Sequence, residues 1–393
     1  MANWQELESK YYMKVFSRLP VVLVRGEGVR VWDENGKSYL DLVAGLAVNV
    51  LGHVHPKVTD AICKQAKTLI HTTNLYHTVP QLELAELLVE NSCADRVFFG
   101  NSGAEANEGA IKLARKYGRL NRDGAYEVIS TFNSFHGRTL ATIAATGQEK
   151  FQKPFLPMPD GFKQVPFNDL EAMKAATTEK TAAVLIEIVQ GESGVHPADH
   201  DYVVGLREWC DKQGLLLMLD EIQTGLGRTG KFLAYELHGI KPDVFTLAKG
   251  LAGGVPIGAV LATEKASVFE LSDHGSTFGG NPLATAAGVA TVKTIFEEGL
   301  VQNAADVGAY ALEKARALQA KHDVVDEVRG VGLMIAFDLK RDIAPALVQA
   351  ALKEGVILNN TSAKTIRMIP PLIVTKSDMD EAFATIDRLL PTL

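Results

Sequence analysis

The sequence lacks the features that mark several large classes of protein. Its three cysteines, Cys63, Cys93 and Cys210, are odd in number and widely spaced, which excludes a full disulfide framework and fits a reducing compartment. The net charge of −7 excludes the basic character of proteins that bind nucleic acid or anionic membranes. No apolar stretch approaches the roughly 20 residues of a membrane span, and the acidic segment Met1–Glu8 lacks the apolar core of a signal peptide. We therefore expect a cytoplasmic protein with no nucleic-acid or membrane partner.

What the sequence does contain is a repeated alternation of short apolar runs and amphipathic stretches. Its 393 residues, 47% of them hydrophobic, are enough for two domains. Between about residues 56 and 270, continuous apolar runs separated by helical periods predict an α/β domain with a mainly parallel sheet covered by helices. The predicted strands are Val97–Gly100, Glu127–Thr131, Ala183–Val189, Leu215–Asp220, Val244–Ala248 and Gly258–Thr263.

The two ends of the chain predict a second, smaller α+β domain. A long helix, short strands and further helices follow the large region, and the N-terminal segment carries the strand-like runs Val21–Val24 and Val29–Trp32. We expect residues 1–50 to join the small domain, residues 51–283 to form the large domain, and residues 284–393 to form the rest of the small domain.

Two charged residues end buried apolar runs in the large region. Lys249 follows Val244–Ala248, and Asp220 follows Leu215–Leu219. Ligands of α/β sheets gather beyond the carboxyl ends of the strands, so we expect both side chains at one site. Desolvation lowers the pKa of a buried lysine and makes it a nucleophile that forms a Schiff base with a carbonyl compound. A lysine with an aspartate counter-ion for a pyridinium nitrogen is what a pyridoxal phosphate enzyme needs, although Asp220 could equally cap a helix.

The segment Asn101–Asn107 follows a predicted strand and opens a helix. Free N–H groups and the positive end of the helix dipole favour an anion at such a place, and Gly103 permits close approach. Ser102 and Glu105, three residues apart, also fit a capping box. The two interpretations are compatible.

Three further motifs carry weaker signals. Phe135 could stack on a planar cofactor and Arg138 could clamp a carboxylate, or the two could be a packed ring and a surface arginine. Thr277 could donate to a phosphate, or its loop could be an ordinary turn. Arg367 lies on an otherwise apolar strand, where a snorkelling edge arginine is the alternative.

Two apparent motifs do not support a site. Gly225–Gly230 matches G-x-G-x-x-G, but four residues separate it from the preceding strand and the next acidic residue, Glu236, is only six positions beyond it. A dinucleotide site requires glycines directly after a strand and an acidic residue about 20 positions on. His53 and His55, two apart before Pro56, have no supporting set of carboxylates or cysteines, so we expect no metal.

Taken in order, these motifs resemble those of class III, fold-type-I, pyridoxal-phosphate-dependent aminotransferases, and particularly the acetylornithine aminotransferase family. One departure is Glu187–Gln190, which reads Glu-Ile-Val-Gln where many relatives have Glu-Pro-Ile-Gln. The change alters backbone rigidity but removes no chemical group. The resemblance runs nearly end to end through Gly45–Asn49, Leu51–His53, Asn101–Glu108, Phe135–Thr139, Asp220–Gly225, Gly227–Gly230, Ala248–Gly250, Ser276–Pro282 and Pro370–Leu372.

The resemblance implies a role in cofactor binding for eight residues. Lys249 would bond covalently to pyridoxal 5′-phosphate and later shuttle a proton. Asp220 would pair with the ring nitrogen, Gln223 would lie near the ring hydroxyl, and Phe135 would stack on the ring. A homodimer with shared active sites is implied as well, because one phosphate ligand would come from the other subunit. The phosphate would be held by Ser102, Gly103, Ala104 and the partner subunit's Thr277.

The resemblance also implies how substrates bind. Arg138 and Arg367 would clamp the two carboxylates of a substrate, with Ser276 close by. Glu192 would pair with Arg367 while a substrate without a second carboxylate is bound. Leaving one partner of a buried ion pair unmatched costs roughly 3–5 kcal/mol, so a carboxylate that moves on and off Arg367 lets one site serve both substrates.

The implied reaction is a ping-pong transamination. The terminal amine of N2-acetylornithine would pass to the cofactor, and 2-oxoglutarate would take it up, giving N-acetylglutamate 5-semialdehyde and glutamate in arginine biosynthesis. Ornithine, 4-aminobutyrate, succinylornithine and succinyldiaminopimelate aminotransferases are alternatives, because several loops build the pocket for the distal group. A nicotinamide-dependent oxidoreductase, or a relative that keeps the fold without catalysis, would belong to a different class.

Overall fold

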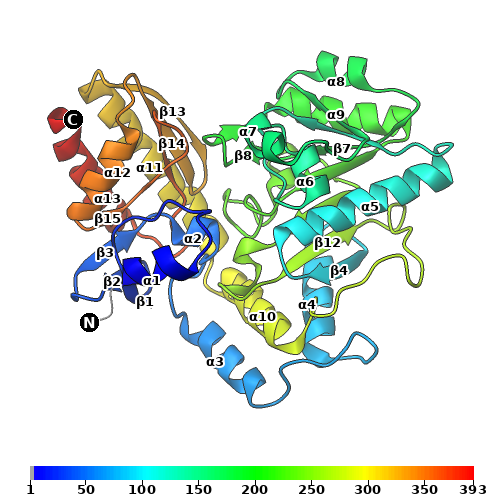
Figure 1. Ribbon diagram of the computed structural model, residues 1–393, viewed down its shortest axis with the longest axis horizontal. Coiled ribbons are helices and arrows are strands. Elements are labelled where there is room, and N and C mark those ends of the chain that lie inside the picture. The colour runs from blue at the N-terminus through cyan, green and yellow to red at the C-terminus, as the bar shows by residue number, and fades with distance from the viewer. Residues whose placement is uncertain (1–3) are drawn as a thin grey trace.

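A seven-stranded sheet forms the centre of the larger of two lobes (Figure 1). All neighbouring pairs are parallel except those made by β12, which is antiparallel to both β4 and β11. The prediction of a mainly parallel sheet is therefore confirmed. In spatial order the strands are β4 (Arg96–Gly100), β12 (Gly258–Ala262), β11 (Val244–Leu247), β10 (Leu216–Asp220), β7 (Thr181–Ile186), β5 (Glu127–Thr131) and β6 (Phe162–Val165).

The computed structural model describes residues 4–393, so residues 1–3 of the predicted N-terminal segment lie outside the described residues. The α-helices are α1 (Trp4–Tyr11), α2 (Ala44–Ala47), α3 (Pro56–Ala66), α4 (Val79–Glu90), α5 (Gly103–Asn121), α6 (Leu140–Ala145), α7 (Glu149–Gln152), α8 (Leu170–Ala176), α9 (His200–Gln213), α10 (Pro282–Glu297), α11 (Leu300–Lys321), α12 (Ala344–Lys353) and α13 (Lys376–Leu389). Four short 3-10 helices are η1 (Lys153–Phe155), η2 (Ala234–His238), η3 (Lys249–Ala252) and η4 (Leu390–Thr392).

Strand β10 shows why the central strands consist of continuous apolar residues. Leu217 and Leu219 belong to one buried cluster, whereas Leu216 and Met218 belong to another. Successive side chains of a strand point to opposite faces, so both faces of the sheet are covered. Helix α5 packs across β7, β11 and β12, and α9 packs on β10. This covering leaves the ends of the strands as the places where polar side chains can gather.

The predicted strand Ala183–Val189 is wrong at its C-terminal end. Strand β7 stops at Ile186, and Val189 belongs to the hairpin of β8 (Val189–Gln190) and β9 (His196–Pro197). The chain leaves the sheet at Glu187, whose carboxylate accepts a hydrogen bond from a loop N–H. Strand β6 was not predicted, because the edge strand Phe162–Val165 has only four residues, with two polar ones at its centre, and forms no recognisable apolar run.

Both chain ends contribute to the smaller lobe, as predicted (Figure 1). Strand β15 pairs in parallel with β3, placing Val356 opposite Leu40. A second sheet lies beside the larger lobe and carries Arg367. The two sheets have the orders β1 (Leu23–Glu27), β2 (Arg30–Asp33), β3 (Ser38–Asp41), β15 (Val356–Ile357), and β13 (Val325–Val331), β14 (Met334–Leu339), β17 (Thr365–Met368), β16 (Asn359–Asn360).

The domain boundary expected between residues 283 and 284 falls within the first turn of α10. This helix packs against α3, α4 and η3, which belong to the larger lobe. We therefore propose that the boundary lies after α10, near Glu298. Within residues 4–393, none of the helices is both long and apolar enough to cross a membrane.

Candidate active site

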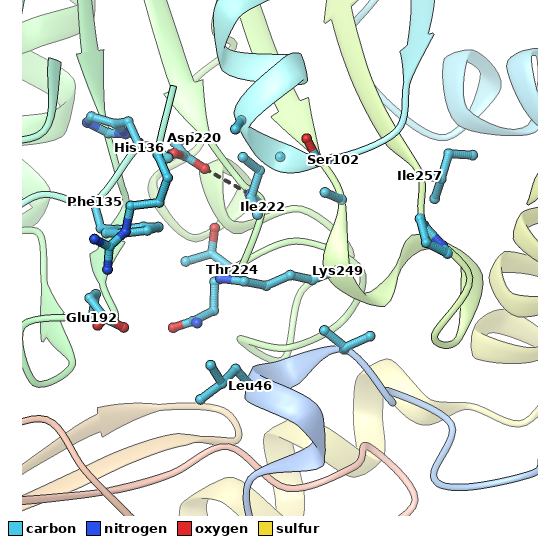
Figure 2. Close-up of a pocket in the computed structure, with 18 of the residues that line it drawn as sticks. Leu46, Ser102, Phe135, His136, Glu192, Asp220, Ile222, Thr224, Lys249 and Ile257 are labelled. Atoms are coloured by element: carbon cyan, nitrogen blue, oxygen red, sulfur yellow. Dashed lines mark hydrogen bonds and ion pairs between the residues drawn. The ribbon is translucent and has the colours of Figure 1, made fainter. Parts of the chain in front are cut away.

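A cavity of about 540 Å³ opens beyond the carboxyl ends of β10 and β11. Its volume lies in the range of about 300–1,000 Å³ that small-molecule sites occupy. Leu46, from the N-terminal segment, faces the cavity from the side opposite the sheet (Figure 2). The predicted residues that line it are Lys249, Asp220, Ser102, Gly103, Ala104, Phe135, Gln223, Arg138 and Glu192.

Lys249 extends into this cavity (Figure 2). Its backbone φ of 39° lies in the left-handed region, where a residue with a side chain is strained. Burial of the amine lowers the pKa of Lys249 below its ordinary value, an effect that the charge of Asp220 opposes. The next residue, Gly250, packs so tightly that a Cβ there would lie 2.4 Å from Val50 Cγ1. The local backbone thus holds the amine toward the cavity in a surrounding that favours its nucleophilic form.

Asp220 is the last residue of β10 and is almost fully buried. Its Oδ2 accepts from Asn107 Nδ2 at 2.7 Å and lies 2.8 Å from His136 Nδ1. Its Oδ1 accepts from the Ile222 N–H at 3.1 Å (Figure 2). The Asn107 amide is fixed in turn by Thr246, whose hydroxyl donates to Asn107 Oδ1 at 2.8 Å. Because a carboxylate oxygen carries two lone pairs, Oδ1 retains capacity for a second donor.

The segment 102–104 forms the N-terminus of α5. Ser102 is the N-cap, and its Oγ accepts from the Glu105 N–H at 3.2 Å. Only half of the predicted capping box is therefore present, because Glu105 Oε2 accepts from the Asn101 N–H at 2.7 Å and not from the Ser102 N–H. The same turn lines the cavity. A Cβ at Gly103 would lie 2.8 Å from Ile222 Cδ1, so glycine lets the turn approach the Asp220 loop. The dipole and N–H groups of this 19-residue helix favour an anion at the cavity.

Phe135 and Arg138 lie on the other wall. The Phe135 N–H donates to Glu187 Oε2 at 3.1 Å, and the Phe135 ring meets Phe151 edge-on at 5.8 Å. The Arg138 guanidinium lies 3.8 Å from the centre of the Phe151 ring and is exposed. A guanidinium that stacks on a ring keeps its in-plane N–H donors for a carboxylate.

Glu192 lines the cavity, and Arg367 lies directly behind it. Arg367 Nη1 is 3.5 Å from Glu192 Oε2 and donates to Gly191 O at 2.7 Å. Asn359 Oδ1 accepts two further hydrogen bonds from the Arg367 guanidinium. Burial lowers the pKa of Arg367, and Glu192 partly offsets that shift. The arginine is therefore a paired, buried residue rather than an edge residue that snorkels to solvent.

Ser276 and Thr277 lie outside the cavity wall. Ser276 Oγ accepts from Asn101 Nδ2 at 3.2 Å, which places it next to the phosphate-loop candidate. Thr277 is exposed and borders a separate small depression beside His71. Within one copy of the chain, the structure does not bring Thr277 to Lys249.

Several residues at the site were not among the predicted site residues, and three of them bear on its charge. Asn107 and His136 both contact Asp220, and Glu187 lines the cavity. Burial and the charge of Asp220 raise the pKa of Glu187 well above its ordinary value. One signal in the sequence could have found Glu187, because it follows a buried strand just as Asp220 ends one.

Gly225–Gly230 lacks the structural context of a dinucleotide fingerprint, in which the glycines join a strand directly to a helix. The segment is a series of turns and opens no helix. Its Arg228 is fully buried and donates to backbone carbonyls of Leu333 and Pro370 in the smaller lobe. The motif therefore links the two lobes.

The residues present fit pyridoxal phosphate. Gln223 Oε1 is buried without a hydrogen-bond partner among the described residues, which suits an acceptor for a ring hydroxyl. The same cavity holds an amine for an aldehyde, a carboxylate for a ring nitrogen and a helix N-terminus for a phosphate.

Comparison with known proteins agrees with this geometry. The family model described as aminotransferase class-III matches residues 11–390. Acetylornithine aminotransferases of Caldanaerobacter subterraneus subsp. tengcongensis and Methanocaldococcus jannaschii are 51% and 52% identical, each over 98% of this chain and 98% of the relative. A solved structure of ornithine aminotransferase from Toxoplasma gondii, with partial occupancy of pyridoxal phosphate at its active site, superposes with a TM-score of 0.95 at 33% identity. The superposition covers 99% of this chain and 93% of that one. This chain belongs to the class-III aminotransferases.

Proposed function

We propose that this enzyme transfers the terminal amine of N2-acetylornithine to 2-oxoglutarate with pyridoxal 5′-phosphate as cofactor. The products are N-acetylglutamate 5-semialdehyde and glutamate. The observation that carries the chemistry is the meeting of Lys249 and Asp220 in one cavity at the ends of neighbouring strands. The names of relatives that are about half identical over nearly the whole chain support the substrate.

Each cofactor-binding residue has a distinct task. When bound, the cofactor supplies an aldehyde that takes up the amine and a ring that accepts electrons. Asp220 keeps the ring nitrogen protonated, and the N-terminus of α5 holds the phosphate. Phe135 would pack against the ring, and Gln223 Oε1 would accept a hydrogen bond from the ring hydroxyl. Lys249 Nζ moves a proton to and from the substrate carbon that bears the transferred nitrogen, and such acid–base catalysis contributes about 10²–10⁴ in rate.

Arg138 and Arg367 bind the two carboxylates of 2-oxoglutarate and glutamate. Acetylornithine has one carboxylate and a neutral acetamide, so it brings no carboxylate to Arg367. Glu192, 3.5 Å from Arg367, neutralises it in that half-reaction. One site then accepts both substrates without leaving a buried charge unmatched.

We further propose that the enzyme works as a homodimer. Large apolar side chains are exposed around residues 69–82 and at Phe278, and such a patch marks an interface. Thr277 is exposed within the same region, where it could reach the phosphate of the other subunit. Free Cys63, Cys93 and Cys210 support a cytoplasmic location.

Mixed dimers test the shared site. Each site would take Lys249 from one subunit and Thr277 from the other. Dimers of one Lys249→Ala chain and one Thr277→Ala chain should therefore contain one intact site with parental affinity for the cofactor. Mixed dimers with the weak cofactor affinity of the Thr277→Ala homodimer would contradict the arrangement.

Ornithine aminotransferase is the second candidate, since the T. gondii structure superposes closely, although at lower identity. Single-turnover reactions of the yellow holoenzyme with acetylornithine, ornithine, 4-aminobutyrate and succinylornithine distinguish the candidates. We expect acetylornithine to bleach the cofactor absorbance fastest. A clear lead for ornithine would overturn the substrate assignment while leaving the reaction class intact.

A further inference from the structure

Glu192 lies in the tight turn 191–195 that joins β8 to β9. The turn is strained, because Val195 has a φ of 60° and is fully buried. A β-branched residue rarely adopts this conformation and keeps it only when the surrounding structure enforces it. The turn that carries the proposed switch residue must therefore be held from outside.

Two arginines of the smaller lobe, which lie in line across neighbouring strands of one sheet, donate hydrogen bonds to this turn. Arg329 on β13 is paired with Ala336 on β14, and Ala336 is paired with Arg367 on β17. Residues paired across neighbouring strands project to the same face. Arg367 Nη1 donates to Gly191 O at 2.7 Å, and Arg329 Nε donates to Gly194 O at 2.8 Å. The carbonyls of Gly191 and Gly194, on either side of Glu192, thus accept hydrogen bonds from two arginines that lie in line across the same sheet.

Arg329 is itself fixed. Asp338 accepts from its Nη1 and Nη2 at 2.7 and 3.0 Å, and Thr365 Oγ1 donates to Asp338 at 2.7 Å. The Arg329 side chain is only 8% exposed. A Cβ at Gly194 would lie 3.0 Å from Arg329 Nη2, so the contact is close as well as hydrogen-bonded.

The opposite side of the turn is equally confined. A Cβ at Gly191 would lie 1.8 Å from Gln223 Oε1, so the turn is wedged between the Asp220 loop and the two arginines. Within this frame the Glu192 side chain keeps 37% exposure and a long contact of 3.5 Å to Arg367. The backbone of Glu192 is therefore fixed while its carboxylate is weakly bound. This suits a side chain that must pair with Arg367 and separate from it in every catalytic cycle.

We propose that Arg329 is a positioning residue that sets how strongly Glu192 competes for Arg367, and so sets the preference between dicarboxylate and monocarboxylate ligands. The inference rests on the proposed function, because it assigns a control to the same switch. If Arg329 releases Gly194, the turn relaxes and Glu192 pairs with Arg367 less often. A dicarboxylate then meets a freer Arg367, whereas a monocarboxylate loses the partner that neutralises that arginine.

The test is the ratio of dissociation constants for glutarate and pentanoate, two unreactive acids, measured by calorimetry on the holoenzyme. Arg329→Lys keeps the charge beside Asp338 but loses the planar donor to Gly194. We expect Arg329→Lys to change this ratio by about fivefold in favour of glutarate binding, which is the size of effect typical within one hydrogen-bonded network. Arg341→Lys, the same change at an exposed arginine of the smaller lobe, should leave the ratio unchanged.

A double-mutant comparison separates positioning from general damage. In a Glu192→Gln background, Arg329→Lys should not move the ratio further, because the competitor is already gone. Amide hydrogen exchange in residues 189–197 should be faster in Arg329→Lys than in the parent. Asp338→Asn weakens the ion pair that orients Arg329, so it should shift the ratio of dissociation constants in the same direction. This variant replaces Arg329→Lys in the test if Arg329→Lys does not fold.

Equal weakening of both acids, or an unchanged shift in the Glu192→Gln background, would overturn the role of Arg329. These outcomes are distinguishable from failure of the proposed function. The acids need only bind, so the ratio is measurable even if the parent enzyme does not transaminate acetylornithine.

Discussion

Asp220 and His136 share a hydrogen bond of 2.8 Å between Oδ2 and Nδ1, and both side chains are buried. Asn107 donates to the same oxygen. Two donors on one oxygen orient the carboxylate so that the other oxygen faces the Ile222 loop and the cavity. This relationship supports the proposed role of Asp220 as the counter-ion of a cationic ring.

Asp220→Asn should therefore slow both half-reactions by about 10²–10³, the typical effect of losing one preorganised electrostatic group. The cause is the loss of the charge that keeps the ring nitrogen protonated. Asp243→Asn is a matched control, since Asp243 is also buried but pairs with Arg207 and Lys265 away from the cavity. Rapid-mixing spectroscopy of each half-reaction measures the rates, and a loss below tenfold in Asp220→Asn would contradict this role.

Arg138→Ala and Glu192→Gln should separate the two carboxylate sites. In the proposed function Arg138 binds a carboxylate of both substrates, so its loss should raise KM for acetylornithine and 2-oxoglutarate together. The proposed role of Glu192 is to neutralise Arg367 when the second carboxylate is absent, so Glu192→Gln should raise KM chiefly for acetylornithine. Steady-state kinetics with each substrate varied in turn gives both values. Equal effects of Glu192→Gln on the two substrates would refute the switch.

Glu187→Gln should have an effect that depends on pH. Burial and the charge of Asp220 raise the pKa of Glu187, so the folded protein keeps this carboxyl protonated to higher pH than usual. Below the raised pKa, glutamine resembles the neutral acid and still accepts from the Phe135 N–H. The ratio of variant to parent kcat should be near one at low pH and should depart from one as pH rises and the parent ionises. Glu187→Ala, which removes the acceptor of the Phe135 N–H, should have a lowered kcat at every pH. If the kcat ratio of Glu187→Gln to parent stays far from one and does not change with pH, Glu187 is not protonated at low pH in the way proposed.

Gly250→Ala should disturb the backbone that presents Lys249. The new Cβ would lie 2.4 Å from Val50 Cγ1, and Val50 is buried. Overpacking of this kind costs about 1–3 kcal/mol. Thermal unfolding should show the loss, and cofactor uptake by the apoenzyme should slow. Adding Val50→Ala should restore part of both, whereas a double variant no better than Gly250→Ala alone would show that the contact is not the cause.

Much of the fold followed from local patterns. Strand β10 ends in Asp220, and Lys249 follows the end of β11 by two residues, so strand and site were visible together. The edge strand β6 was missed because Phe162–Val165 is too short and too polar to form a run. The end of β7 was misplaced because Ile188 and Val189 continue the apolar run after the chain has left the sheet.

The site was less predictable where it depends on tertiary contacts. Asn107 lies on the buried face of α5, but its partner Asp220 is 113 positions away, and no local pattern records that pairing. Arg329 and Gly194 are likewise joined only by the fold. Thr277, whose role was implied by resemblance, lies away from Lys249 in the single chain, and its assignment depends on a second copy.

The covalent link to Lys249 is the claim on which the rest depends. Borohydride reduction of the yellow holoenzyme, followed by digestion and peptide mass spectrometry, locates that link. We expect the reduced cofactor on the peptide that contains Lys249, and no adduct in Lys249→Ala. An adduct on any other lysine, or none in the parent enzyme, would contradict the proposed chemistry.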